Sequence, residues 1–228
     1  HSGETPAFYG DAGSGSLHFS LAGPTGSGRR TALAAVANAF CDAGLITSRE
    51  VRYLTKGDLE GAYVGHTPGR TRAAIAANQG GLIVISNPSS MLPLADGRTY
   101  GPEAINTVLG CIPEYEQNTC FVFVDTQEGM EAFFKHYPHA RRVLGKNFQL
   151  NDLSLETMQR IFHLKAQHRL TFAPDVQELL DDFIANWVND RGGLGDNFTA
   201  WTNGAAIDQL LTDVITSWTN QGGETLKD

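Results

Sequence analysis

Two patterns of hydrophobic and polar residues alternate along the first 150 residues. Short apolar runs at 17–22, 51–54, 82–85 and 120–124 are separated by longer segments in which apolar residues recur at helical spacing. The run at 82–85 has no polar interruption, as expected for a strand covered on both faces. This alternation predicts an α/β fold, with a parallel sheet and helices on both of its faces.

The segments between these runs predict helices. The first helix places Leu33, Ala37 and Phe40 on one face. In the second, Thr67 is the expected N-cap and Pro68 the first helical residue. The four predicted helices cover residues 30–43, 67–80, 102–111 and 128–137.

Helical spacing continues after residue 151, but strand patterns stop. Apolar stripes at 155–162, 176–188 and 207–218 predict three further helices. We therefore expect an α/β domain followed by a small all-α subdomain. The predicted organisation is a flexible Gly/Ser-rich segment at 1–16, the α/β core at 17–150, the helical subdomain at 151–220 and a polar tail at 221–228.

Composition and charge narrow the class of protein. Hydrophobic residues make up 41% of the 228 residues, which is enough to bury a core, and the formal net charge is −8. An acidic chain is a poor match for nucleic acid or anionic lipid, and no run of about 18 apolar residues predicts membrane insertion. Three cysteines without CxxC spacing and a polar start at 1–4 predict a cytoplasmic protein with no disulfide, zinc site or signal peptide.

A glycine-rich loop carries the sharpest chemical signal. Residues 23–28 read GPTGSG, follow the first strand and open the first helix, where a phosphate-binding loop is expected. Such loops continue with Lys and Ser/Thr, whereas this chain has Arg29 and Arg30. Arginine is longer and planar, and it cannot ligate Mg²⁺. We expect either that both arginines fill the phosphate pocket or that the loop is collapsed; a strand-to-helix turn without a ligand is the alternative interpretation.

Several blocks occur in an order that resembles the AAA+ domain of the CbxX/CfqX family, which includes red-type Rubisco activases and the AAA+ component of type VII secretion. The resemblance covers residues 17–215 and implies a P-loop AAA+ core with a parallel sheet, followed by an all-α lid. Its blocks are the glycine loop, DLEGAYVGHT at 58–67, GGLIVISNP at 80–88, YGPEAI at 100–105 and MEAFF at 130–134.

The same resemblance exposes the departures from an active ATPase. Family members end the third strand with Asp-Glu, which positions Mg²⁺ and polarises the attacking water, whereas this chain has Ser86 and Asn87, a degenerate Walker B motif. The arginine-finger position falls on Val143, and Arg142 is the candidate displaced finger. The sensor-2 stretch at 203–209 lacks both arginines, and Asp208 there would repel phosphate.

One functional block is retained. Tyr63, Val64 and Gly65 correspond to the family's pore loop, in which the aromatic side chain grips a substrate polypeptide. The alternative interpretation is that Tyr63 is a partly buried loop aromatic.

The sequence therefore predicts a catalytically inactive AAA+ module without catalytic residues, cofactor or metal. It would act as a scaffold, regulator or ring-assembly domain, with other AAA+ domains or subunits as its protein partners. One alternative is a domain that binds ATP or ADP without hydrolysis, through Gly23, Gly26, Gly28 and Arg29. The other is an active ATPase that takes catalytic groups from a neighbouring subunit.

Overall fold

The computed structural model describes residues 16–94, 99–167, 180–186 and 203–220. The chain divides into two compact units. The first comprises the chain up to Ala22 together with Arg30–Gln149, and the second comprises Gly23–Arg29 together with the chain from Leu150 onward. Most of the predicted N-terminal segment and the whole polar tail lie outside the described residues.

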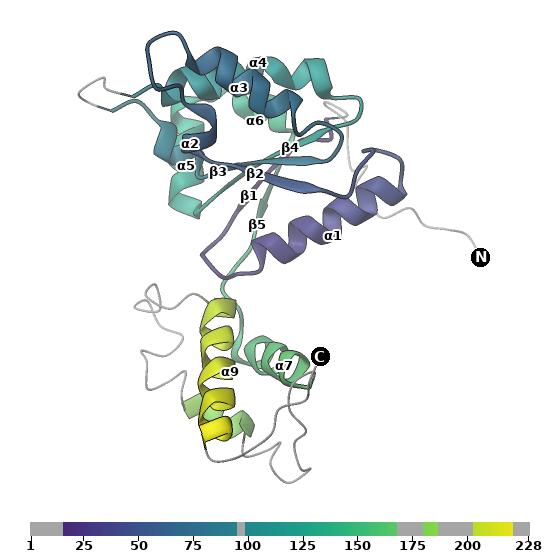
Figure 1. Ribbon diagram of the computed structural model, residues 1–228, viewed down its shortest axis with the longest axis vertical. Coiled ribbons are helices and arrows are strands. Elements are labelled where there is room, and N and C mark those ends of the chain that lie inside the picture. Colours follow the sequence, from purple (N-terminus) through teal and green to yellow (C-terminus); the bar gives the residue numbers. More distant parts are fainter. Residues whose placement is uncertain (1–15, 95–98, 168–179, 187–202, 221–228) are drawn as a thin grey trace. The chain divides into compact units, whose positions relative to one another are not determined.

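The first unit is built on a five-stranded sheet in which every neighbouring pair is parallel (Figure 1). The strand order is β2-β3-β4-β1-β5, so the first strand lies inside the sheet and the last lies at its edge. The strands are β1 (Phe19–Ala22), β2 (Val51–Leu54), β3 (Leu82–Ser86), β4 (Cys120–Asp125) and β5 (Lys146–Gln149).

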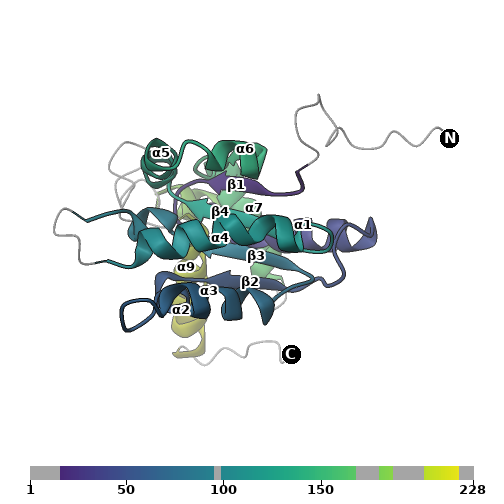
Figure 2. The ribbon, with the colours of Figure 1, turned by 90° about the horizontal axis from the view of Figure 1, so that it is seen from above.

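Helices cover both faces of this sheet. Helix α1 lies on the opposite face from α3 and α4 (Figure 1), and α3 and α4 pack side by side (Figure 2). The helices of this unit are α1 (Arg29–Asp42), α2 (Lys56–Leu59), α3 (Thr67–Ala76), α4 (Gly101–Tyr115), α5 (Gln127–His136) and α6 (Ala140–Leu144), with one 3₁₀ turn, η1 (Pro88–Met91). The predicted α/β class, a parallel sheet between helices, is confirmed.

The core of this unit lies between β3, β4 and the helices that cover them. All four residues of the apolar run 82–85 are fully buried, as are Phe121 and Phe123 of β4. Ile83, Ile85, Phe121 and Phe123 pack in one cluster with side chains of α4 and α5, Phe133 among them. Continuous burial explains why these two strands have no polar residue in their interiors.

Several predicted bounds need correction. Helix α3 is capped by His66 rather than Thr67, which is its first residue, and it ends at Ala76. Helix α4 continues past residue 111 to Tyr115, with Pro113 in its last turn. The short elements α2, η1, α6 and β5 have no counterpart in the prediction, because runs of four or five residues carry too little periodicity to detect.

The second unit contains helix α7 (Leu155–Ala166), a helical stretch at 180–186 and helix α9 (Asn203–Asn220). Their shared core includes Met158, Phe162, Ile184, Ile207 and Leu210. Only part of the predicted helix at 176–188 falls within the described residues. Across all the described ranges, no helix combines the length and apolar character needed to cross a membrane.

Candidate functional site

Ligands of open parallel sheets bind at the carboxyl ends of the strands. At this edge of the first unit, β4 lies between β1 and β3. Ala22 pairs with Asp125, and Ser86 pairs with Val124. The strand register therefore places Asp125 between the end of β1, which continues into the glycine loop, and the end of β3.

The glycine loop itself has left-handed backbone geometry. Gly26 and Gly28 have φ values of 79° and 88°, which side chains rarely tolerate. The loop leads into α1, a helix of 14 residues. Successive backbone N–H groups at such a helix start form a nest for an anion. The Ser27 hydroxyl is buried there and has no hydrogen-bond partner among the described residues.

The Arg30 side chain contacts an aromatic residue of β2. Its guanidinium carbon lies 4.5 Å from the ring centroid of Tyr53, a cation–π contact. The expectation that Arg30 fills the phosphate pocket is therefore wrong, since this aromatic ring holds its charged end.

The end of β3 is a tight turn without a carboxylate. Asn87 adopts a left-handed conformation with φ 50° and ψ 58°, which asparagine tolerates better than most residues. Its N–H donates to the Val124 carbonyl at 2.8 Å, and its carbonyl accepts from the Ser90 hydroxyl at 2.7 Å. Ser86 and Asn87 thus begin the turn into η1, and neither side chain carries a charge.

Asp125 is the carboxylate that sequence reasoning missed at this edge. It is 3% exposed, and its two oxygens accept from the backbone N–H groups of Ser89 at 3.0 Å and Thr126 at 2.8 Å. A Cβ on Gly129 would come within 2.3 Å of this carboxylate, so α5 can approach it only with glycine there. The sequence feature that could have identified Asp125 is an aspartate directly after a buried apolar strand.

The segment Gly61–His66, here called the exposed loop, projects its apolar side chains outward. Tyr63 is 70% and Val64 81% exposed. The ring of Tyr63 packs edge to face on that of His66, with 5.5 Å between the two ring centroids. The interpretation of Tyr63 as a partly buried aromatic is therefore wrong. The loop borders a hollow of about 490 Å³, lined by Gly61, Ala62, Tyr63, Gly65, His66, Gly69 and Arg70.

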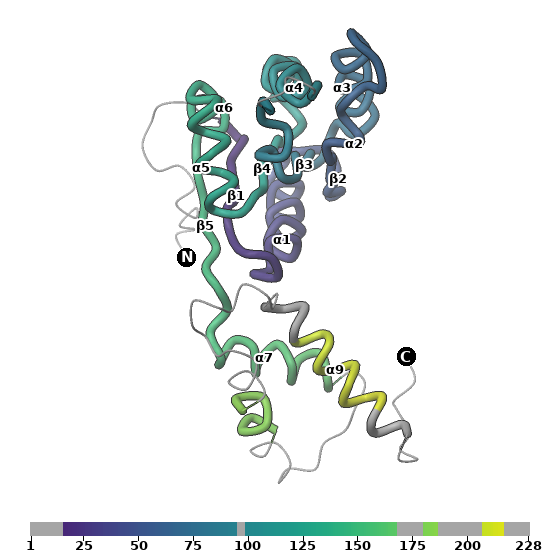
Figure 3. Tube along the Cα trace, turned by 90° about the vertical axis from the view of Figure 1, so that its left-hand side faces the viewer, coloured from purple at the N-terminus to yellow at the C-terminus, as the bar shows by residue number. Residues whose placement is uncertain are grey.

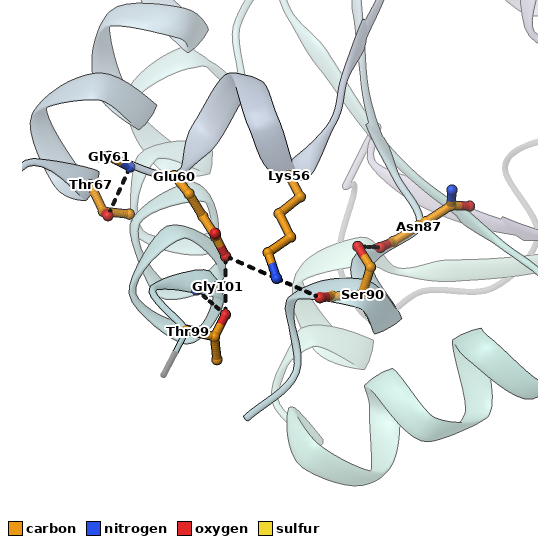
Figure 4. Close-up of polar contacts among 8 residues, drawn as sticks. All are labelled: Lys56, Glu60, Gly61, Thr67, Asn87, Ser90, Thr99 and Gly101. Carbon is orange, nitrogen blue, oxygen red and sulfur yellow. Dashed lines mark hydrogen bonds and ion pairs between the residues drawn. The ribbon is translucent and has the colours of Figure 1, made fainter. Parts of the chain in front are cut away.

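Polar contacts fasten the base of the exposed loop to η1 and to the start of α4 (Figure 4). The Glu60 carboxylate lies 3.7 Å from the Lys56 ammonium and accepts from the Thr99 hydroxyl at 3.2 Å. Lys56 also donates to the Ser90 carbonyl at 3.3 Å. Because Ser90 belongs to η1, the end of β3 and the exposed loop are joined through one lysine and one glutamate.

Helix α2, which leads into the exposed loop, is held at both ends. The Thr55 hydroxyl and N–H donate to the Asp58 carboxylate at 2.6 and 2.8 Å, and these bonds hold the pKa of Asp58 below its usual value. Arg70 donates to the carbonyls of Gly57 at 2.7 Å and Asp58 at 3.0 Å. The Gly61 N–H donates to the buried Thr67 hydroxyl at 3.1 Å. The loop therefore starts and ends on anchored backbone.

The remaining predicted positions lie elsewhere. Arg142 is an exposed residue of α6 at the β5 side of the sheet, and Val143 packs partly buried against the core. Asp208 forms an ion pair with Lys165 of α7 within the second unit. The structure thus joins the end of β3 to the exposed loop through Lys56 and Glu60. Arg142 on α6 and Asp208 on α9 are not part of these contacts.

Comparison with known proteins gives the relatives of this chain. No protein-family model matches it. It is 28% identical over 143 residues to the chloroplastic ribulose bisphosphate carboxylase/oxygenase activase of Cyanidioschyzon merolae, covering 63% of this chain and 47% of that protein. It is 23% identical over 187 residues to Protein CfxQ of Xanthobacter flavus, with coverage of 79% and 59%, and 25% identical over 169 residues to Protein CbbX of Cereibacter sphaeroides, with coverage of 74% and 55%.

The chain thus spans only about half to three fifths of the length of the curated relatives that it matches. Among solved structures, the ADP form of the Aeropyrum pernix ORC2 protein superposes with a TM-score of 0.62 at 14% identity, covering 92% of this chain and 59% of that one. These findings confirm the resemblance seen in the sequence: the chain has the P-loop AAA+ fold, and its homologues are the CbxX, CfxQ, CbbX and Rubisco activase-like AAA+ proteins.

Proposed function

We propose that this chain is an AAA+ module that does not hydrolyse ATP and that acts through protein partners, as a scaffold, regulator or ring subunit. The observation that carries the proposal is the end of β3, where Ser86 and Asn87 stand in place of two carboxylates. ATP hydrolysis needs charge at this point to hold Mg²⁺ and to polarise water. An amide and a hydroxyl carry no charge, and neither is a general base that can activate water.

Two neighbouring observations support the loss of activity. Asp125 is the nearest carboxylate on the adjoining strand, but backbone N–H groups bind both of its oxygens. Arg30 occupies the position where a P-loop has the Mg²⁺-binding hydroxyl, and its side chain rests on Tyr53. Both side chains are therefore already engaged in contacts within the first unit.

Steady-state phosphate release from Mg²⁺-ATP is expected to stay at the buffer rate across the accessible range of protein concentration. Several protein concentrations are needed because an ATPase that takes catalytic groups from a neighbouring subunit would show a rate that rises more than linearly with protein concentration. Arg29→Ala tests whether any residual turnover uses the glycine loop, and Arg49→Ala is its control, since Arg49 is an exposed arginine paired with Asp42. Turnover that disappears in Arg29→Ala but persists in Arg49→Ala would overturn the proposal.

A second candidate function is nucleotide binding without hydrolysis. The buried Ser27 hydroxyl favours it, because it has no partner among the described residues and buried hydroxyls are normally satisfied. The left-handed backbone of Gly26 and Gly28 suits a loop that wraps an anion. ATP or ADP would place its phosphates at this loop, held by Gly23, Gly26, Gly28 and Arg29. The nucleotide would then serve as a ligand that stabilises one conformation.

If this second function holds, millimolar ADP raises the free energy of unfolding, by about 2.7 kcal/mol when ADP is present at a hundred times its Kd. Gly28→Val is expected to abolish the effect, because Gly28 has a φ of 88°. Gly110→Ala is the matched control, since an added Cβ there meets no atom within 4 Å. Calorimetric titration and thermal unfolding measure both variants; an unchanged melting temperature in the wild type removes this candidate.

The exposed loop is the proposed contact with a polypeptide partner. Tyr63 and Val64 present apolar surface outward on an anchored backbone, so little conformational entropy is lost on binding.

The three cysteines are free thiols, which supports the proposed location in a reducing compartment, the cytoplasm.

A further inference from the structure

The glycine loop contains a buried hydroxyl that its own fold leaves unsatisfied. Ser27 is 6% exposed, and its side-chain oxygen has no hydrogen-bond partner among the described residues. The loop is also tightly packed, since a Cβ on Gly23 would come within 3.1 Å of this oxygen and 2.9 Å of the Leu150 carbonyl oxygen. Because a buried hydroxyl without a partner costs free energy, its presence here indicates that a ligand completes the loop.

The backbone around Ser27 indicates the charge of that ligand. Gly26 and Gly28 have φ values of 79° and 88°, a conformation in which successive N–H groups converge on an anion. Figure 3 shows β1 continuing through the loop into α1, whose first residues are Arg29 and Arg30. The start of this helix carries a partial positive charge, and Arg29 adds a full one. A hydroxyl, backbone N–H donors and an arginine together suit a phosphate group.

Mg²⁺, which accompanies nucleotides in P-loop proteins, does not suit the corresponding residues of this chain. Such proteins hold the ion through a serine or threonine directly after the loop lysine and through an acid at a strand end. The first position is Arg30, whose guanidinium lies on the Tyr53 ring and cannot coordinate a cation. The second is Ser86, which ends β3 and carries no charge.

The Asp125 carboxylate does not suit Mg²⁺ either. This ion retains several waters when proteins bind it, so it needs an open carboxylate. Asp125 is 3% exposed, and its oxygens accept from the N–H groups of Ser89 and Thr126. A Cβ on Gly129 of α5 would come within 2.3 Å of this carboxylate, so backbone takes up the space that a hydrated ion requires. The phosphate therefore fits this chain and its usual metal ion does not.

We infer that the glycine loop binds a diphosphate group without a metal ion, through Ser27, the loop N–H groups and Arg29. The inference rests on the second candidate function under the proposed function, binding without hydrolysis, and names the form of its ligand. A planar guanidinium binds two phosphate oxygens at once, so Arg29 neutralises charge that Mg²⁺ neutralises elsewhere. A third phosphate adds charge that P-loop proteins offset with the bridging metal. ADP and inorganic pyrophosphate, which share the diphosphate group, are therefore preferred to ATP.

Calorimetric titration of the whole chain with ADP, pyrophosphate and ATP tests the inference, each in excess EDTA and in excess Mg²⁺. We expect the diphosphate to bind in EDTA, ATP to bind more weakly, and Mg²⁺ to strengthen none of them. Binding of only ADP or only pyrophosphate would identify the source of the diphosphate. A higher ADP affinity in Mg²⁺ than in EDTA, or a higher affinity for ATP than for ADP, would overturn the inference. So would the absence of both a binding heat and a rise in melting temperature with either diphosphate.

The substitution Ser27→Ala separates ligand binding from folding. It removes an unsatisfied hydroxyl, so the melting temperature of the free protein is expected not to fall, while the affinity for the diphosphate in EDTA is expected to fall about tenfold. Ser154→Ala is the matched control, because the Ser154 hydroxyl caps α7 and accepts from the Thr157 N–H at 3.2 Å. The control is expected to show the reverse, a lower melting temperature and an unchanged affinity. A Ser27→Ala protein that binds like the wild type would contradict the inference.

The inference and the proposed loss of hydrolysis fail on different measurements. If ADP binds only together with Mg²⁺, the inference is overturned while ATP turnover stays at the buffer rate. If neither diphosphate binds, the inference and the second candidate function fall together, and the proposed function stands. Steady ATP turnover would overturn the proposed function whatever the effect of Mg²⁺ on ADP binding.

Discussion

Replacing Phe133 by alanine is expected to lower the free energy of unfolding of the first unit by about 3–5 kcal/mol. The side chain is fully buried, and its ring centroid lies 5.3 Å from that of Phe123, 5.4 Å from that of Phe134 and 5.3 Å from that of Tyr137. Its removal leaves a cavity between α5 and β4 and deletes three aromatic contacts.

Urea unfolding followed by far-ultraviolet circular dichroism measures this loss. The three tryptophans all lie after residue 150, so their fluorescence follows the second unit separately. Tyr63→Ala is the control: it removes an aromatic side chain that is 70% exposed, and the expected change is within about 0.5 kcal/mol. A loss below about 1 kcal/mol for Phe133→Ala would contradict the packing described for the core.

Acidification from pH 7 to pH 4.5 is expected to remove about 2–3 kcal/mol of stability through His18 alone. Burial lowers the pKa of His18 from 6.5 to about 4. Its ring nitrogen Nδ1 accepts from the Phe121 N–H at 3.1 Å, which requires that nitrogen to be unprotonated. The unfolded chain takes up a proton near pH 6.5, but the folded chain does so only near pH 4. Stability is therefore unaffected above pH 6.5, falls as the pH drops from 6.5 to 4 and levels off below that.

The substitution His18→Gln isolates this effect, because glutamine retains a hydrogen-bond acceptor but does not titrate. The difference in unfolding free energy between wild type and His18→Gln, measured by urea denaturation at several pH values, is expected to change by up to about 1.4 kcal/mol per pH unit between pH 6 and 4.5. Carboxylates titrate in both proteins and cancel in this difference. Parallel pH profiles for the two proteins would show that folding does not lower the pKa of His18, and they would contradict this prediction.

Local patterns predicted much of the first unit and failed where residues depend on distant neighbours. The runs 82–85 and 120–124 are strands because a strand buried on both faces needs continuous apolar sequence. Strand β5 escaped prediction because it is an edge strand with all four residues exposed, so nothing in its sequence resembles a buried strand. Its position is decided by pairing with β1, more than 120 residues earlier in the chain.

The candidate site divides in the same way. The glycine loop, the uncharged pair Ser86 and Asn87, and Tyr63 with its neighbours are visible in the sequence because each is a short contiguous motif. Asp125 could be placed at the site only once the sheet was known, because parallel pairing puts it between the ends of β1 and β3. The pairing of Lys165 with Asp208 likewise joins two helices that no local pattern connects.

By itself, the sequence of this protein determined the alternation of strands and helices, the glycine-rich turn and the absence of carboxylates directly after β3, since backbone preference and burial act over a few neighbouring residues. Only the tertiary structure decided that Arg30 lies on Tyr53 and that Lys56 and Glu60 join the exposed loop to η1. Contacts of this kind depend on which segments meet in space, and the order of strands in the sheet sets that arrangement.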